Sequence, residues 1–245
     1  MRPQDWAFFA GLAAAVFTVA MAVQGSWLAA IGGVALTTAF DRGSHALSRR
    51  HHGPMPPFFR WGLLLPRHVL DAAHLIHLLA PRPGERIFEL GPGPGAHALP
   101  VAAALSPSGT LCVLDVQPVM LEHLARRAAR AGVANLEATL ADGRTLPYPA
   151  SIFDGAYLID VLGELPDARA ALGELRRILK PDGRLVVGEH FLDPDFVSLR
   201  TLEAAARDFG FALESRHGIR LIYLARFKVV TPGRPVPLPC PLVDS

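Results

Sequence analysis

Short apolar segments alternate with amphipathic segments from residue 69 to residue 227, and this alternation constrains the fold more than any other feature. Strands that alternate with helices build a parallel sheet with helices on both faces. We therefore expect an α/β domain with a doubly wound, mostly parallel seven-stranded sheet that ends in an antiparallel pair. Residues 180–183 (Lys-Pro-Asp-Gly) should end the fourth helix. The predicted strands are 86–90, 110–114, 136–139, 155–159, 184–188, 212–216 and 221–227, and the predicted helices are 69–79, 98–105, 119–131, 168–179 and 197–209.

Three alternating glycines, Gly91, Gly93 and Gly95, directly follow the first predicted strand. Such a turn lets the chain bend sharply and lets a ligand lie against bare backbone. Because doubly wound sheets bind ligands beyond the carboxyl ends of their strands, this turn is a candidate ligand site. The turn alone leaves two interpretations open, since Gly91, Gly93 and Ala96 also satisfy the G-x-G-x-x-G/A pattern of dinucleotide-binding domains.

Acidic residues accompany the first three strands of the alternation. Asp115 follows the second strand, where a carboxylate can accept hydrogen bonds from both hydroxyls of a ribose. Glu89 precedes the first glycine by two residues, where it can meet the ammonium group of a ligand. Asp142 and Gly143 follow the third strand, where a short acceptor can receive an adenine amino group. Together these residues predict a site for an adenosine-containing ligand.

The segments FELGPGPG, LDV, ADGRTLPYPASIFDGAYLIDVLGEL and ELRRILKPDGRLVVGEH stand in an order that resembles the class I S-adenosylmethionine-dependent methyltransferases. Within them the sequence is most similar to the ubiquinone/menaquinone-biosynthesis C-methyltransferase-like group (methyltransferase type 11). The resemblance covers about residues 65–228. It implies a Rossmann-like methyltransferase fold with S-adenosylmethionine as the cofactor, and it disfavours a nicotinamide dehydrogenase.

The resemblance also implies roles for individual residues. The glycine turn and Glu89 would hold the methionine part of the cofactor, and the residues after the second and third strands would hold its adenosine. Two alternatives stay open, because Gly95 could instead cap a helix and Asp160 could cap the turn after the fourth strand. The implied cofactor-binding set is Glu89, Gly91, Gly93, Gly95, Asp115, Val116, Asp142, Gly143 and Asp160.

Methyl transfer to a carbon or oxygen acid needs a base for the acceptor's proton. Asp160 and His190 stand at predicted strand ends and are candidates, although His190 could equally be structural. His74 and His77 could share one helix face, but no carboxylate or cysteine joins them in ligand spacing, so we expect no metal site. The segment between His190 and the next helix is short, so we expect no substrate-covering insertion there.

An uncharged run of 35 residues occupies positions 6–40. A membrane-spanning helix needs roughly 20 apolar residues, and Gln24-Gly25-Ser26 interrupts the run where a turn would fall. We predict a transmembrane helical hairpin over residues 1–41. One span followed by an interfacial helix is an alternative, and a signal peptide is disfavoured because the apolar run continues past the candidate cleavage site.

Residues 42–64 follow the run with prolines, aromatic residues and arginines, and we interpret them as an elbow at the membrane interface. The five arginines between positions 42 and 67, with no acid among them, indicate the cytoplasmic side of an inner cell membrane. A plain solvated linker is the alternative. We expect a methyltransferase-like domain over residues 65–229 and a proline-rich extended tail over residues 230–245, which suits contact with a partner.

Composition excludes several functional classes. A formal net charge of +2 gives no overall basic field for nucleic acid, and Cys112 and Cys240 stand in no ligand or disulfide-framework spacing. Two hypotheses remain. The first is a membrane-anchored methyltransferase acting on a hydrophobic acceptor such as a quinone, a phospholipid or a pigment precursor. The second is a methyltransferase-like accessory subunit of a larger respiratory or photosynthetic membrane complex, in which a membrane protein contacts the anchor and the tail.

Overall fold

The computed structural model describes residues 68–230 together with Ala10 and Ala14. Residues 191–196 group with a compact unit other than the sheet domain, and the two are described apart. The predicted hairpin, elbow and tail lie outside the described residues, apart from Ala10, Ala14 and Val230. Among the helices that are described, none has the length and apolar character needed to cross a bilayer.

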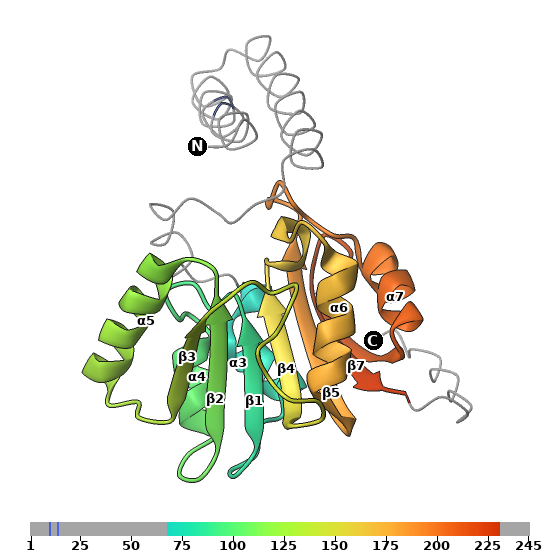
Figure 1. Ribbon diagram of the computed structural model, residues 1–245. Helices are drawn as coiled ribbons and strands as arrows, with labels where there is room; N and C mark the ends of the chain where they lie inside the picture. The colour runs from blue at the N-terminus through green and yellow to red at the C-terminus, as the bar shows by residue number, and fades with distance from the viewer. Residues whose placement is uncertain (1–9, 11–13, 15–67, 231–245) are drawn as a thin grey trace. The chain divides into compact units, whose positions relative to one another are not determined.

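Seven strands form one sheet in the order β3-β2-β1-β4-β5-β7-β6, in which β7 runs antiparallel to its neighbours β5 and β6 (Figure 1). This is the expected doubly wound, mostly parallel sheet with a terminal antiparallel pair. The helical elements are η2 (His68–Leu70), α3 (Ala72–Leu79), α4 (Ala98–Ala104), α5 (Pro118–Ala131), η3 (Leu162–Glu164), α6 (Ala168–Ile178) and α7 (Leu199–Asp208). The strands are β1 (Arg86–Leu90), β2 (Thr110–Asp115), β3 (Leu136–Leu140), β4 (Phe153–Ile159), β5 (Leu179–His190), β6 (Phe211–Ile219) and β7 (Ile222–Val229).

Several helices begin at side chains that the sequence makes recognisable as caps. Asp71, Asp167 and Ser198 each accept a hydrogen bond from a backbone N–H three residues later, at the starts of α3, α6 and α7. Gly132 ends α5 in the left-handed conformation. These local signals explain why the helix positions follow the sequence closely.

One local prediction is wrong. The helix before residues 180–183 ends at Ile178, close to its expected end, but the strand expected over residues 184–188 already begins at Leu179 and runs to His190. Leu179 pairs with Phe153 and Arg184 pairs with Gly155, so the intervening residues of β5 form an irregularity in the ladder.

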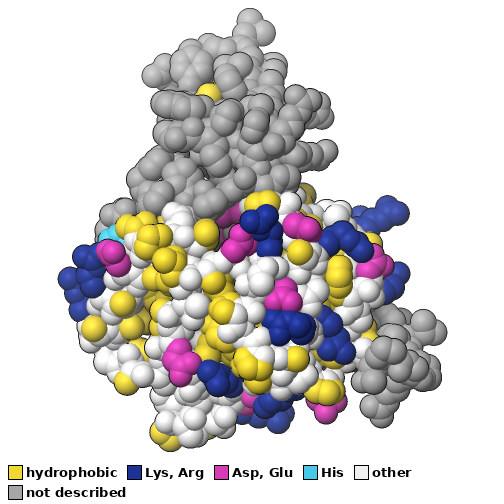
Figure 2. Space-filling model, viewed as in Figure 1, with side chains coloured by type: hydrophobic (Ala, Val, Ile, Leu, Met, Phe, Trp, Pro, Cys, Tyr) yellow, Lys and Arg dark blue, Asp and Glu magenta, His cyan; other side chains and the backbone are white. Residues whose placement is uncertain are grey.

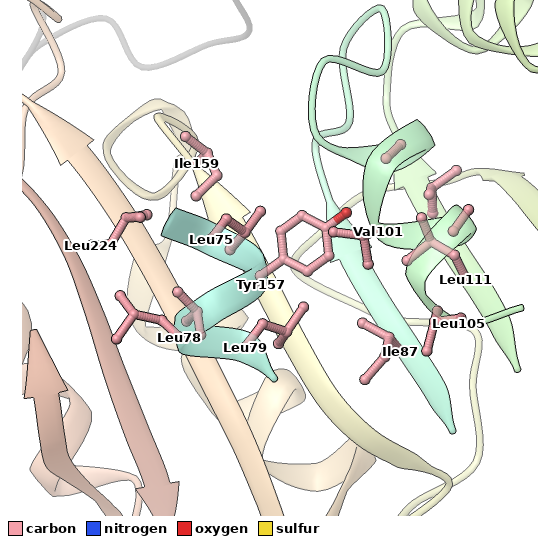
Figure 3. Packing of buried hydrophobic residues seen from close by; sticks show 14 of the residues in the cluster. Leu75, Leu78, Leu79, Ile87, Val101, Leu105, Leu111, Tyr157, Ile159 and Leu224 are labelled. Carbon is pink, nitrogen blue, oxygen red and sulfur yellow. The ribbon is translucent and has the colours of Figure 1, made fainter. Parts of the chain in front are cut away.

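Helices cover both faces of the sheet, with α3 and α4 behind it and α6 in front in the view of Figure 1. The core on the α3–α4 side contains aliphatic side chains from these helices and from the strands, and Figure 3 shows the Tyr157 ring among them. Tyr157 is fully buried, yet its hydroxyl reaches the carboxylate of Glu89 on the neighbouring strand. A polar pair therefore lies between the core and the edge of the sheet where the glycine turn begins.

The face in Figure 2 carries Lys and Arg side chains intermixed with Asp and Glu side chains rather than a field of one sign. Charged side chains of the described residues form ion pairs, including Arg144–Asp142 and Lys180–Asp154. Exposed pairs of this kind contribute little to stability.

Candidate functional site

A cleft of about 180 Å³ opens at the carboxyl ends of β1, β2 and β4. Its walls come from the glycine turn, the start of α5, the turn after β3 and the loop after β4. The structure brings most of the predicted site residues to this one place, with Glu89 and Gly95 outside the lining. The predicted residues that line the cleft are Gly91, Gly93, Asp115, Val116, Asp142, Gly143 and Asp160.

Gly91 begins the turn in a conformation that side chains disfavour. Its φ is +70°, its N–H donates to the Leu114 carbonyl at 2.8 Å, and a Cβ there would lie 2.5 Å from Cγ2 of Val161. Val161 is β-branched and stiff about χ1, so it yields poorly. The absence of a side chain at Gly91 therefore keeps the backbone bare and lets Val161, another residue of the cleft lining, pack closely against the turn.

Gly91→Ala and Gly132→Ala form a matched pair, because their φ values are +70° and +68° and the space around Gly132 is open. A left-handed alanine costs about 1–2 kcal/mol at either position. Only Gly91→Ala also displaces Val161, an overpacking cost of about 1–3 kcal/mol. We expect the melting temperature to fall in both variants. The affinity for S-adenosylhomocysteine, the adenosine-containing product of S-adenosylmethionine, should fall roughly tenfold or more only in Gly91→Ala. Equal affinities in the two variants would contradict this account.

Gly95 differs from the other two glycines of the turn. Its φ is +84°, and a Cβ there would lie 2.4 Å from Cδ1 of Leu124 on α5. Arg127, one turn further along α5, donates to the carbonyl of Pro94. Gly95 thus allows α5 to pack against the turn, and its place in the structure is at that packing contact rather than in the cleft lining.

Asp115 ends β2 with only 7% of its surface exposed. Its Oδ1 accepts the N–H of Gln117 at 2.8 Å, and the N–H of Gly93 also donates to the carboxyl group. Burial raises the pKa of Asp115 above its ordinary value, although these backbone donors oppose the rise. Val116 beside it exposes 52% of its surface in the cleft wall. The arrangement places a buried acceptor next to an apolar surface, as a ribose and its base require.

Asp142 and Gly143 lie across the cleft from the glycine turn in the loop after β3. The side chain and the backbone N–H of Arg144 donate hydrogen bonds to the Asp142 carboxylate, with Nη2 2.6 Å from Oδ2. These hydrogen bonds lower the pKa of Asp142. A Cβ on Gly143 would lie 2.9 Å from Cδ1 of Leu90. The sequence analysis missed Arg144, whose position two residues after Asp142 is the only sequence signal for this contact.

Asp160 and His190, predicted separately as candidate bases, form a pair. Asp160 follows β4 and His190 ends the adjacent β5, with Nδ1 of His190 3.2 Å from Oδ1 of Asp160. Asp160 has a φ of +55° and its N–H donates to the Gly188 carbonyl at 2.9 Å. Left-handed backbone in a residue other than glycine is uncommon and concentrates at functional sites. The pair lies at the edge of the sheet to which the cleft opens.

The loop after Asp160 supplies the remaining cleft wall, which the sequence analysis did not predict. It combines apolar side chains with one carboxylate, and its only sequence signal is that it directly follows Asp160. The residues concerned are Val161, Glu164, Leu165 and Pro166.

Comparisons with known proteins agree with this geometry. Residues 87–183 match the methyltransferase domain family. The ubiquinone/menaquinone biosynthesis C-methyltransferase of Ectopseudomonas mendocina is 32% identical over 123 residues, which are 50% of this chain and 48% of that protein. The nocamycin O-methyltransferase of Saccharothrix syringae is 33% identical over 114 residues, 46% of this chain and 41% of that protein. The chain thus spans less than half the length of these relatives.

The fold has a counterpart among solved structures. An S-adenosylmethionine-dependent methyltransferase from Aquifex aeolicus superposes with a TM-score of 0.66 at 16% identity, covering 73% of this chain and all of that one. Residues 87–183 are thus similar to a methyltransferase domain, and the solved structure shows the methyltransferase fold.

The residues of the cleft fit S-adenosylmethionine as cofactor. At Gly91 and Gly143 a Cβ would displace Val161 and Leu90, which line the cleft. Buried Asp115 offers a carboxylate to vicinal hydroxyls. Glu89 lies behind the turn, outside the cleft lining, and its Oε2 accepts the Tyr157 hydroxyl at 2.8 Å. Burial raises the pKa of Glu89 to about 8, with the Tyr157 hydrogen bond opposing the rise and the Asp115 carboxylate adding to it.

This raised pKa gives a pH dependence with a definite sign. Below about pH 8 the Glu89 carboxyl is protonated in the cofactor-free domain. If the carboxylate receives the ligand's ammonium group, binding expels that proton, so affinity for S-adenosylhomocysteine should rise from pH 6 to 8 by up to about tenfold per pH unit. Calorimetry in two buffers of different ionisation enthalpy should show release of up to one proton at pH 7. Glu89→Gln should release none, and proton release that persists in that variant would contradict the assignment.

Proposed function

We propose that this protein is a membrane-anchored S-adenosylmethionine-dependent methyltransferase that acts at the cytoplasmic face of the cell membrane on a lipid-soluble acceptor, such as a quinone, a phospholipid or a pigment precursor. The activity rests on one observation above all. The cleft joins a buried carboxylate at Asp115, which suits a ribose, to an apolar wall at Val116 and bare backbone at Gly91 and Gly93. This set supports a working cofactor site.

S-adenosylmethionine, when bound, supplies an electrophilic methyl group on a sulfonium. The tasks left to the chain are to align the acceptor, to exclude water and to receive the acceptor's proton. We assign proton removal to His190 and the orientation of its imidazole to Asp160, because their side chains lie 3.2 Å apart. An acceptor hydroxyl or acidic carbon would pass its proton to His190 as its bond to the methyl carbon forms and the bond between the methyl carbon and sulfur breaks.

The lipid-soluble acceptor is supported by sequence outside the described residues. The 35 uncharged residues at positions 6–40 suit a membrane anchor, and the arginines that follow suit the cytoplasmic side. The relatives' names include one enzyme of ubiquinone/menaquinone biosynthesis and one O-methyltransferase. By analogy with these relatives, we propose that the atom methylated by this chain is an oxygen or a carbon. We also propose that a membrane protein contacts the anchor and the tail at residues 230–245.

Methyl transfer to extracted lipids tests this function. The full chain in nanodiscs, supplied with methyl-labelled S-adenosylmethionine and a total lipid extract, should release label into the organic phase. The His190→Ala variant should not. Label that enters only water-soluble phenols would overturn the lipid acceptor. Binding of S-adenosylhomocysteine without any transfer to quinols, phospholipids or phenols would favour the accessory-subunit alternative.

A further inference from the structure

We propose that the turn between β6 and β7 is a docking surface for anionic phospholipid. We call residues 216–221 the hairpin tip. The inference rests on the proposed function, because it places the bilayer at the acceptor end of the methyltransferase cleft. It assigns to described residues a membrane contact that does not depend on the structure of the first 67 residues.

The hairpin tip exposes aliphatic side chains where water-facing hairpins carry polar ones. Arg220 and Leu221 form a two-residue connection between Ile219 and Ile222, which pair across the ladder. Two-residue hairpins favour Asn, Asp and Gly at the turn. Here Ile219 exposes 61% and Leu221 50% of their surfaces. Two neighbouring aliphatic side chains at a projecting turn suit insertion among lipid acyl chains.

The charges of the hairpin tip are basic. Arg216 and Arg220 are both exposed, and no acidic residue occurs from position 215 to 225. The next acid along the strand, Glu214, is paired with Arg226 at 2.5 Å. Arg216 donates to the Gly218 carbonyl at 3.3 Å, which holds its guanidinium beside the turn. Each arginine near an anionic leaflet strengthens attachment, so charge and exposed apolar surface favour the same partner.

The location of the hairpin tip connects it to the acceptor end of the site. Ile222, the residue after the turn, pairs directly with His190 at the end of β5. Directly opposed residues in an antiparallel ladder lie about 4.5–5.5 Å apart. The hairpin tip therefore lies at the same edge of the sheet as the Asp160–His190 pair, where a lipid-soluble acceptor would leave the bilayer.

The sequence that precedes Val69 is also basic. Val69 packs against Gly218, where a Cβ would lie 2.6 Å from Cγ1 of Val69. The sequence that leads to Val69 carries five arginines and no acid between positions 42 and 67. These arginines carry the same sign of charge as Arg216 and Arg220 of the hairpin tip.

A fluorophore at the hairpin tip tests the proposal. The full chain carries Cys240→Ser and Leu221→Cys, so that an environment-sensitive dye reacts at position 221. Cys112 is buried and should not react. The labelled protein is then reconstituted in nanodiscs. We expect a blue shift, and quenching by doxyl-labelled lipid, with phosphatidylglycerol but not with phosphatidylcholine alone. Ala129→Cys is the matched control and should show neither. Ala129 is exposed near the end of α5, a helix that contacts β3, and β3 and β6 are the two outermost strands of the sheet. Arg216→Glu with Arg220→Glu should abolish the shift.

The outcomes separate this inference from the proposed function. A dye at position 221 that stays in water, in a protein that binds S-adenosylhomocysteine, would overturn the docking surface and leave the methyltransferase standing. A blue shift that appears only in native membranes, and not in nanodiscs of purified lipid, would assign the hairpin tip to a protein partner and would also overturn the proposal. Docking without cofactor binding would instead contradict the proposed function.

Discussion

Asp115→Ala should bind S-adenosylhomocysteine at least about 100-fold more weakly than the unchanged protein. The carboxylate is buried at the end of β2 and held by the N–H groups of Gln117 and Gly93, so it is fixed before any ligand arrives. Hydrogen bonds to a charged group contribute about 1.5–3 kcal/mol each, and losing two ribose contacts removes roughly 3 kcal/mol or more. Every 1.4 kcal/mol is tenfold in affinity. Isothermal titration calorimetry measures the difference.

The control for this prediction is Asp182→Ala, which removes an exposed carboxylate of β5 far from the cleft lining. It should leave affinity unchanged. Asp115→Asn keeps the shape of the side chain and one acceptor oxygen, so its affinity should fall between the other two. Unaltered binding in Asp115→Ala would show that the ribose lies elsewhere.

His190→Ala should lower kcat by roughly 100- to 10,000-fold, the usual contribution of a positioned general base. Binding of S-adenosylhomocysteine should change less than about twofold, because His190 is not among the residues that line the cleft. Asp160→Asn should keep part of the activity, since Asp160 acts on the imidazole at 3.2 Å rather than on the acceptor. Methyl transfer to the best acceptor found in the lipid screen supplies the rate.

The pH–rate profile distinguishes chemistry from structure here. Because a general base must be unprotonated to act, kcat of the unchanged enzyme should fall toward low pH, which gives the profile an acid limb. His190→Ala should have a lower kcat that no longer shows this fall. His77→Ala, an exposed histidine on α3, should change neither. A His190→Ala enzyme with reduced kcat but an intact acid limb would indicate that His190 only supports the fold.

The sheet and the glycine turn were predictable because their signals are local. Apolar runs, capping residues and the spacing from Gly91 to Asp115 all lie within short stretches of sequence, and the structure places them as predicted. The continuation of β5 through residues 180–183 was not predictable in the same way. It depends on pairing between Leu179 and Phe153, which are 26 positions apart, and strand pairing overrides the local preference of Pro181 and Gly183.

The site shows the same division between local and non-local information. Asp115 and Asp142 could be named from their positions after strands. The ion pair between Arg144 and Asp142 depends on side-chain conformation, and the Asp160–His190 contact depends on β4 lying beside β5. Gly95 was grouped with the other glycines because spacing alone does not show that Leu124 of α5 lies 2.4 Å from where its Cβ would be.

The most direct test of the central claim is a calorimetric titration of the unchanged full chain with S-adenosylhomocysteine. We predict saturable one-site binding with a micromolar dissociation constant, accompanied by a higher melting temperature because ligand binding stabilises the folded state. No heat and no shift in melting temperature, from protein that melts cooperatively, would contradict the assignment of the cleft to the cofactor.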